Sequence, residues 1–334
     1  MDCKRFNQYS ALKKFLSIVC LMAVMSCTWV KDDNDDCPYG FWLQLHYSYN
    51  ILDVEAAPKY VTDAYVYVYD ADGKYVKRIY ADKNALMSSN YRVRVEGLTE
   101  GDYQFVVWSG LGSSQYAVSG DGQTMGDFRL SLAVYGTQCS ENLSALYHGS
   151  LSLTHYDDSY AVHDVELMKN TNQLSCLVVP ETSGITLDPA DFNMSIVSAN
   201  GIMNVYNQLV ADSATTYLPF EKTAITVNDG KKGTLSGIRF NISTLRLTSD
   251  TDCLIKLERV STGATLFDKI SLSEQLGKVG TLYTNLDRPL TVPEYLDRQD
   301  FYTIVFILSD DLQMLMDINV TSWRVRAENH LKIN

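Results

Sequence analysis

The first residues whose spacing indicates a chemical reaction are Val24-Met25-Ser26-Cys27, at the end of an apolar run. Four basic residues precede this run, and the run itself, Phe15 to Met25, is too short to span a bilayer. Signal peptidase requires small side chains before the cut, and the thiol of a following cysteine can receive diacylglycerol. The sequence therefore predicts removal of residues 1–26 and a lipid on Cys27. The alternative is an ordinary secretory signal in which this cysteine is coincidental.

An acidic run, Lys31-Asp32-Asp33-Asn34-Asp35-Asp36, follows the lipid site almost at once. Such a run is solvated and self-repelling, so we interpret residues 27–37 as a lipidated acidic tether that holds the folded part away from the membrane. Clustered aspartates can also bind calcium. This run, however, has neither the glycine nor the distal glutamate of an EF-hand loop, and the tether is the favoured interpretation.

The overall charge narrows the partners that the chain can bind. The full sequence carries a formal net charge of -12. Loss of the basic signal peptide makes the mature chain more acidic still, which argues against nucleic acid and against electrostatic attraction to anionic lipid. After the signal, no apolar run reaches the ~18 residues that a membrane helix requires. Attachment to a membrane must therefore come from the lipid on Cys27.

Beyond Cys27, the mature chain contains Cys37, Cys139, Cys176 and Cys253. In an exported protein these could form two disulfides, and the sequence does not choose between the possible connectivities. Cys176 and Cys253 lie in apolar, strand-like runs and could equally be buried thiols. We predict one bridge that involves Cys37, because this residue begins the folded part.

The sequence contains none of the motifs that would indicate catalysis or cofactor binding. It has no G-x-S-x-G elbow, no P-loop and no dinucleotide-binding fingerprint. The histidines and cysteines do not follow a metal-ligand spacing, so no metal site is predicted. The covalent lipid on Cys27 is the one attached group that we expect, and the protein is predicted not to be an enzyme.

From Pro38 onward the pattern is that of β-sheets. Ala64 to Tyr69 alternates tyrosine with alanine or valine, residues 70–74 supply turn chemistry, and Tyr75 to Tyr80 completes a predicted hairpin. Leu98, followed by Gly101-Asp102-Tyr103 at the start of a strand, has the spacing of a tyrosine corner in Greek-key sandwiches. The tyrosine-rich strands could stack on sugar rings, but packing within the sheets is favoured.

A second set of strands begins at Leu174, after a boundary that we place within Val165 to Thr171. Because turn signals recur on both sides of it at sandwich spacing, we predict an all-β chain of two tandem β-sandwiches, residues 38–168 and 169–334. Gly110 to Gly126 is rich in glycine and serine and is predicted to be a surface loop. Short helical turns are predicted at Leu272 to Leu276 and at Pro293 to Arg298.

The order of these features resembles the FimB-like family of fimbrillin-associated anchor proteins, which are minor fimbrial subunits of Bacteroidales. The segments that carry the resemblance extend over nearly the whole mature chain: the lipid site with Asp36-Cys37-Pro38, the hairpin, Gly101-Asp102-Tyr103, Tyr295-Leu296-Asp297-Arg298, and Ile318-Asn319-Val320 with Trp323. In addition, Lys31, Asp32 and Asp33 resemble the short signal that sends Bacteroidales lipoproteins to the outer face of the outer membrane.

The resemblance implies two transthyretin-like Greek-key sandwiches, no catalysis, and a fimbrial subunit that is lipid-anchored in the outer membrane. It also implies fimbrillin partners joined by β-strand exchange, in which an arginine-specific protease removes the first strand and a neighbour's C-terminal strand fills the groove. Between Cys27 and Lys77 this chain has no arginine, and the first one of the mature chain is Arg78. We therefore expect the subunit to keep its first strand and its anchor and to terminate growth of the polymer.

The C-terminus has the pattern of a strand that could be donated to such a groove. Trp323, Val325 and Ala327 alternate with Arg324 and Arg326. The alternative is a last strand that pairs within its own domain, and the two are weighed equally. Two other functions stay open: a surface lipoprotein that binds glycan through exposed aromatic residues, and a tip or accessory subunit of the same fimbrium.

Overall fold

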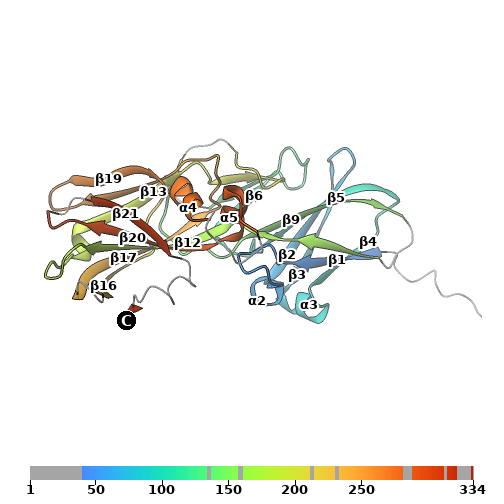
Figure 1. The fold of residues 1–334 in the computed structure, drawn as a ribbon. Coiled ribbons are helices and arrows are strands. Elements are labelled where there is room, and N and C mark those ends of the chain that lie inside the picture. The colour runs from blue at the N-terminus through green and yellow to red at the C-terminus, as the bar shows by residue number, and fades with distance from the viewer. Residues whose placement is uncertain are drawn as a thin grey trace, which may run out of the picture.

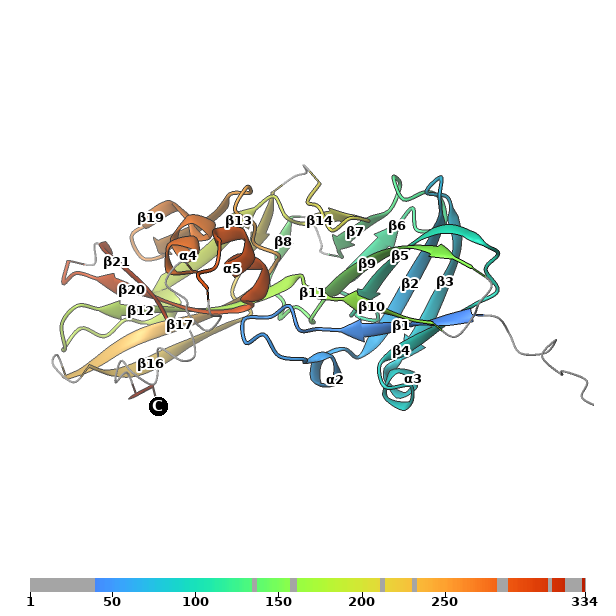
Figure 2. The same cartoon turned by 45° about the vertical axis from the view of Figure 1, so that its right-hand side comes forward.

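The computed structural model describes residues 40–133, 137–156, 161–210, 214–229, 233–280, 288–311, 314–321 and 332–333. Within these ranges most of the regular structure is β-strand (Figure 1). Two sandwiches follow one another along the long axis of the molecule, the first mainly blue and green and the second mainly yellow to red (Figures 1 and 2). The prediction of an all-β chain with two tandem sandwiches is confirmed.

The first sandwich packs a three-stranded sheet against a five-stranded sheet. The three-stranded sheet has the order β10 (Val162–Glu166), β1 (Gly40–His46), β4 (Arg92–Glu96). The five-stranded sheet has the order β11 (Met168–Lys169), β9 (Tyr147–His155), β5 (Gly101–Ser109), β2 (Asp63–Asp70), β3 (Tyr75–Asp82). Two short helices, α2 (Ala57–Tyr60) and α3 (Lys83–Ser88), lie in the connections from β1 to β2 and from β3 to β4.

The second sandwich is built from a six-stranded and a five-stranded sheet. The six-stranded sheet has the order β21 (Met314–Thr321), β20 (Phe301–Leu308), β12 (Thr171–Pro180), β17 (Gly233–Leu245), β16 (Glu221–Asp229), β22 (Lys332–Ile333). The other has the order β19 (Ala264–Ser271), β18 (Cys253–Arg259), β13 (Phe192–Ser198), β15 (Thr215–Tyr217), β8 (Gln138–Cys139). The 3-10 turn η3 (Pro189–Asp191) leads into β13.

The first strands of the two sandwiches occupy equivalent positions. β1 pairs in parallel with β10 and antiparallel with β4. β12 likewise pairs in parallel with β20 and antiparallel with β17. Each first strand therefore has a hydrogen-bonded neighbour on both sides, so its removal would open a groove within a sheet rather than shorten the edge of that sheet.

A small third sheet connects the two halves of the chain. Its order is β14 (Ile202–Asn204), β7 (Arg129–Leu132), β6 (Tyr116–Ser119). Thus β14 comes from the second half of the sequence and β6 and β7 come from the first. β8, which also precedes residue 169, pairs in parallel with β15 of the second sandwich. The two halves are therefore joined by shared sheets as well as by the connection from β11 to β12.

The prediction that Gly110 to Gly126 is a surface loop is wrong in part. This segment contains β6, and Tyr116 and Met125 are buried. The physical reason is that the third sheet covers an apolar face of the first sandwich, which would otherwise be exposed to water.

The alternation of residues on β2 reflects two buried faces. Val66 and Val68 belong to the core between the two sheets of the first sandwich. Tyr67 and Tyr69, on the opposite face, are 1% and 0% exposed and pack in a cluster with Phe128, near the third sheet. These two tyrosines therefore serve packing, as favoured from the sequence, and are not available to stack on a sugar.

Two local predictions in the first sandwich are confirmed. β2 and β3 form the hairpin, and the Asp70 carboxylate accepts hydrogen bonds from the backbone N–H groups of Asp72 and Lys74. The hydroxyl group of Tyr103 donates to the carbonyl oxygen of Thr99 at 3.0 Å, which is the contact expected of a tyrosine corner.

The two predicted helical turns are also present. The first is α4 (Leu272–Gly280), which extends beyond the predicted Leu276, and the second is α5 (Val292–Arg298). Thr291 caps α5, since its hydroxyl oxygen accepts a hydrogen bond from the N–H of Glu294 at 3.3 Å. The described part of the chain holds no helix with the length and apolar character that crossing a membrane requires.

The three cysteines that the structure describes, Cys139, Cys176 and Cys253, are buried free thiols. Burial raises the pKa of both Cys176 and Cys253 to about 12, so neither is a reactive thiolate at neutral pH. Cys37 lies outside the described residues, and the bridge predicted for it stays a prediction. Across the same described ranges, no cluster of three or more His, Cys, Asp or Glu side chains is arranged to hold a metal ion.

Candidate functional site

The residues that the sequence singles out for function lie outside the described part of the chain. They are Cys27, Lys31, Asp32, Asp33, Cys37, Trp323, Val325 and Ala327. Their roles in lipidation, export, disulfide bonding and strand donation therefore stay predictions. The structure does describe the strand that follows the tether, β1, and the last long strand, β21. The candidate functional site is built from these two strands and the residues that hold them.

One face of β1 is fixed in the core of the first sandwich. Phe41, Leu43 and Leu45 alternate along the strand and are 2%, 0% and 1% exposed. The ring of Phe41 packs edge-on against Phe105, with centroids 5.5 Å apart. Burial of each of these side chains stabilises the fold by roughly 1.5–3 kcal/mol, so the strand cannot leave without a large loss of stability.

The opposite face of β1 is held by two arginines of β4. The guanidinium of Arg94 lies over the ring of Trp42, 5.3 Å from the ring centroid. Nε of Arg92 donates to Oε1 of Gln44 at 2.8 Å. Arg92 and Arg94 therefore both contact the neighbouring strand, which is the expected cross-strand arrangement on an antiparallel pair.

The C-terminal end of β1 is bound by charged side chains. His46 lies between Glu55 and Asp164, with Nδ1 2.7 Å from Oε2 of Glu55 and Nε2 3.1 Å from Oδ1 of Asp164. Desolvation lowers the pKa of His46, but the hydrogen bonds to the two carboxylates outweigh it and leave this pKa above its usual value. His46 therefore links β1 both to β10, through Asp164, and to the loop that follows β1, through Glu55.

Sequence reasoning did not identify Arg298 as a contact of this region. Arg298 is the last residue of α5, in the second sandwich. Its Nη1 donates to Oδ1 of Asp53, a residue of the loop after β1, at 3.0 Å. No sequence signal could have found this pair, because 245 positions separate the two residues. Arg298 entered the sequence argument only as part of the segment that carries the family resemblance.

The described part of the C-terminal segment is paired within its own domain. β21 runs antiparallel to β20, with Ile318 opposite Phe306 and Val320 opposite Ile304. Of the two alternatives for the last strand, internal pairing therefore holds for the residues up to Thr321. The alternating residues predicted for donation lie beyond that point.

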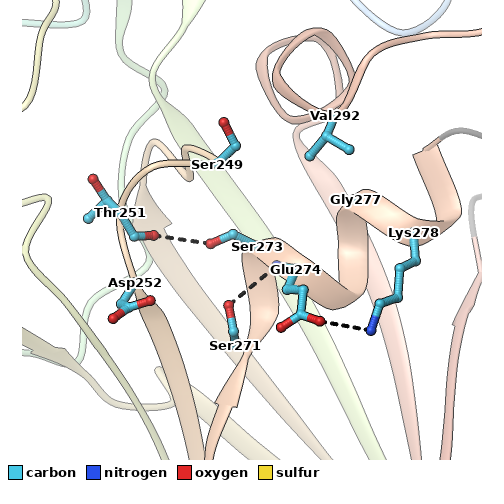
Figure 3. Close-up of a pocket in the computed structure, with 9 residues that line it drawn as sticks. All are labelled: Ser249, Thr251, Asp252, Ser271, Ser273, Glu274, Gly277, Lys278 and Val292. Carbon is cyan, nitrogen blue, oxygen red and sulfur yellow. Dashed lines mark hydrogen bonds and ion pairs between the residues drawn. The ribbon is translucent and has the colours of Figure 1, made fainter.

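A polar cavity of about 630 Å³ lies beside α4 in the second sandwich (Figure 3). The Ser273 hydroxyl donates to the backbone carbonyl of Thr251 at 3.2 Å, and Glu274 forms an ion pair with Lys278 at 2.9 Å. Among the described residues that line the cavity, none is a histidine, a cysteine or an aromatic residue.

Comparison with solved structures gives three informative matches. A Bacteroides thetaiotaomicron protein described as a candidate adhesin is 26% identical, with a TM-score of 0.75 over 86% of this chain and 97% of its own. A second protein of that species, described as a candidate polysaccharide-binding protein, is 25% identical, with a TM-score of 0.73 over 85% of this chain and 96% of its own. The fimbrial anchor protein Mfa2 from Porphyromonas gingivalis is 17% identical, with a TM-score of 0.62 over 86% of this chain and 98% of its own, and so shares the fold.

No curated protein matches the chain. A family model, however, matches residues 34–329, a range that covers both sandwiches and includes Cys37 and Trp323. The model describes structural anchor proteins and not an enzyme, in agreement with the absence of catalytic motifs from the sequence. The chain belongs to the family of the fimbrillin-A associated anchor proteins Mfa1 and Mfa2.

Proposed function

We propose that this protein is a non-catalytic fimbrial anchor, held in the outer membrane by a lipid on Cys27, that binds fimbrillin subunits and terminates growth of the fimbrium. Membership of the anchor family supports a fimbrial role at the cell surface. The lipid rests on the signal sequence that ends at Cys27. Termination rests on one observation above the others: β1 is buried and paired on both sides, and no arginine lies between the tether and the end of β2.

The position of Arg78 supports retention of β1. Arg78 is the first arginine of the mature chain and lies on β3, opposite Tyr67 of β2. Its side chain forms an ion pair with Asp121 at 3.3 Å. A protease would have to unfold a paired strand to cleave there, and the cut would detach β1 and β2 together. A cut that releases β1 alone would need an arginine in the loop after β1, where the chain has none.

The anchoring role is tested by cell fractionation and electron microscopy of a Cys27→Ala strain. We expect the variant to lose radiolabelled palmitate, to leave the envelope fraction, and to release fimbriae into the medium. Cys20→Ala is the matched control, since that cysteine is removed with the signal and its loss should change nothing. Palmitate on the Cys27→Ala protein, or cell-bound fimbriae of normal length in that strain, would contradict the proposal.

Termination is tested by introducing an arginine on either side of β1, in cells that contain the arginine-specific protease. Asn34→Arg places the cut in the tether, so the protein should leave the membrane with β1 still in place. Leu52→Arg places the cut after β1, at a side chain that is 56% exposed, so β1 should leave and the subunit should now accept a neighbour's strand. Asn34→Lys and Leu52→Lys are the matched controls. If the fimbriae of the Leu52→Arg strain do not exceed those of the Leu52→Lys strain in length, termination by β1 is refuted.

Glycan binding is the second candidate function. It is supported by the 25% identical relative that is described as a candidate polysaccharide-binding protein. The exposed aromatic rings that could serve it include Tyr80 and Tyr206, each 56% exposed. The glycan proposal expects Tyr80→Ala or Tyr206→Ala to abolish saccharide binding while the cells keep their fimbriae. Saccharide binding that survives both substitutions would remove these rings from consideration.

A further inference from the structure

The loop that leaves β1 makes a second set of contacts that the anchoring role does not by itself require. We call residues 47–56, with the side chain of Arg298, the clasp. Nη1 of Arg298 donates to the backbone oxygen of Asn50 at 3.2 Å and to Oδ1 of Asp53 at 3.0 Å. The guanidinium also lies over the ring of Tyr49, 4.2 Å from its centroid. One side chain of the second sandwich therefore contacts three residues of this loop.

Arg298 is fixed from its own side as well. Its Nε donates to Oε1 of Glu294 at 2.9 Å, one turn earlier on α5. The Arg298 side chain is only 10% exposed, and that of Glu294 is 14% exposed. A planar guanidinium can lie flat on a ring while its N–H groups donate within its own plane, a combination that the tetrahedral ammonium group of lysine does not reproduce. The clasp therefore requires arginine at this position rather than a positive charge alone.

The same loop is bound firmly to the first sandwich. The carboxylate of Glu166, at the end of β10, accepts hydrogen bonds from the backbone N–H groups of Ser48 and Tyr49 at 2.7 and 2.9 Å and from the Ser48 hydroxyl at 2.8 Å. The side chain of Asn50, 8% exposed, donates to the backbone oxygens of Tyr47 and Val54. The loop is thus a stiff connection between β1 and α5.

The direction of β1 determines how a pull on the tether acts on this connection. β1 runs along the long axis of the molecule, from its start at the outer end of the first sandwich toward the second sandwich (Figure 2). A pull on the tether loads the strand along its own axis. Backbone hydrogen bonds to β4 lie across this direction, so the bonds to β10 and β4 resist together and do not break one at a time.

We infer that β1 and the clasp form a path that carries tension from the tether, through Arg298, into the second sandwich. This inference rests on the proposed function, because tension arises only if the tether is anchored and the rest of the chain is held by a fimbrium. The clasp keeps the two sandwiches together under load, so that force reaches β1 as shear.

The test is constant-force spectroscopy on the purified, unlipidated mature chain. One handle is joined to its N-terminus and the other to the exposed turn between β18 and β19 through Thr262→Cys. We expect Arg298→Lys to raise the rate of unfolding under load about tenfold, which corresponds to loss of roughly 1.4 kcal/mol of stabilisation. Arg288→Lys is the matched control, because Arg288 binds the same carboxylate of Glu294, at 2.6 Å from Nη2 to Oε1, and is 56% exposed.

A second pulling geometry separates mechanical from general stability. Moving the N-terminal handle to the exposed hairpin turn, through Asp72→Cys, removes the load from β1, and the effect of Arg298→Lys should then be smaller than with the N-terminal handle. Should Arg298→Lys not fold, Asp53→Asn weakens one contact, because it removes the negative charge while it keeps Oδ1, at a side chain that is 55% exposed, and the same expectation holds at smaller size. Equal effects of Arg298→Lys and Arg288→Lys, or equal effects in both geometries, would overturn the inference. Because no membrane is present, these results are independent of whether Cys27 carries a lipid.

Discussion

The hydroxyl group of Tyr103 donates a hydrogen bond to the carbonyl oxygen of Thr99, four residues earlier in the chain, and it lies 3.2 Å from Oγ1 of the same threonine. The ring is 8% exposed. The phenol thereby fixes the arch that leads into β5, the central strand of the five-stranded sheet of the first sandwich.

Substitution of this phenol should destabilise the first sandwich without changing its shape. Tyr103→Phe keeps the ring and removes the hydroxyl, so we expect a loss of about 1 kcal/mol in the free energy of unfolding. Urea denaturation followed by far-UV circular dichroism measures the loss. Tyr80→Phe is the control, because that side chain is 56% exposed and should show no change beyond experimental error.

Gly277 sets the distance between the two short helices of the second sandwich. A Cβ atom at this position would lie 2.6 Å from Cγ1 of Val292, a β-branched side chain at the start of α5. In an open helix Gly→Ala stabilises by about 1 kcal/mol, but overpacking of this kind costs about 1–3 kcal/mol. We therefore expect Gly277→Ala to lower the melting temperature.

A double substitution distinguishes this clash from other effects. Gly277→Ala with Val292→Ala removes the offending methyl groups, so the melting temperature should rise above that of Gly277→Ala alone. A single Gly277→Ala protein as stable as the wild type would show that α4 and α5 can move apart at no cost.

His148 should make the interface between the two halves sensitive to acid. Burial lowers the pKa of His148 to about 4, although the ring is hydrogen-bonded to the backbone oxygen of Val205 at 3.0 Å. The unfolded chain, with a usual histidine pKa of about 6.5, binds more protons between these values, so stability falls as the pH decreases from about 6.5 to 4. We expect His148→Gln to lose less stability than the wild type over this interval, as measured by urea titration at several pH values. Parallel pH profiles for the two proteins would argue against a buried neutral histidine.

His46 should show the opposite sign. Its folded-state pKa lies above the usual value, so its contribution is fully present below about pH 6.5 and is lost as the pH rises through the folded-state value. The difference in stability between the wild type and His46→Gln should therefore be largest under acidic conditions and smallest under alkaline ones. Nuclear magnetic resonance titration of the His46 ring checks the direction of the shift. A pKa at or below that of an unfolded reference peptide would contradict the role of Glu55 and Asp164.

Short-range features could be predicted from the sequence because their causes are local. The hairpin of β2 and β3 follows from alternation with a period of two and from the Asp70 and Gly73 turn residues. The helical turn at α5 follows from Thr291 as its N-cap and Pro293 in its first turn. In both cases a residue within the element or next to it supplies the hydrogen bonds that fix the cap or the turn.

The sequence could not predict that the second face of a sheet is covered by other parts of the chain. The alternation on β2 shows that two different faces exist, but not that both are buried. The glycine-rich composition of Gly110 to Gly126 indicated a loop, whereas Tyr116 and Met125 within it are covered in the structure. The composition of the segment is an average over all its residues. Burial depends instead on individual apolar side chains, here two, that pack against another part of the structure.

The sequence by itself determined the number and type of the sandwiches and the absence of arginine between Cys27 and Arg78, and it predicts the signal that ends at Cys27, since each depends on residue types or on near neighbours in the chain. Only the tertiary structure decided that β1 lies between β10 and β4 and that Arg298 reaches Asp53. Parallel pairing across more than a hundred residues, and an ion pair across 245, arise from the packing of whole sheets and leave no local pattern in the sequence.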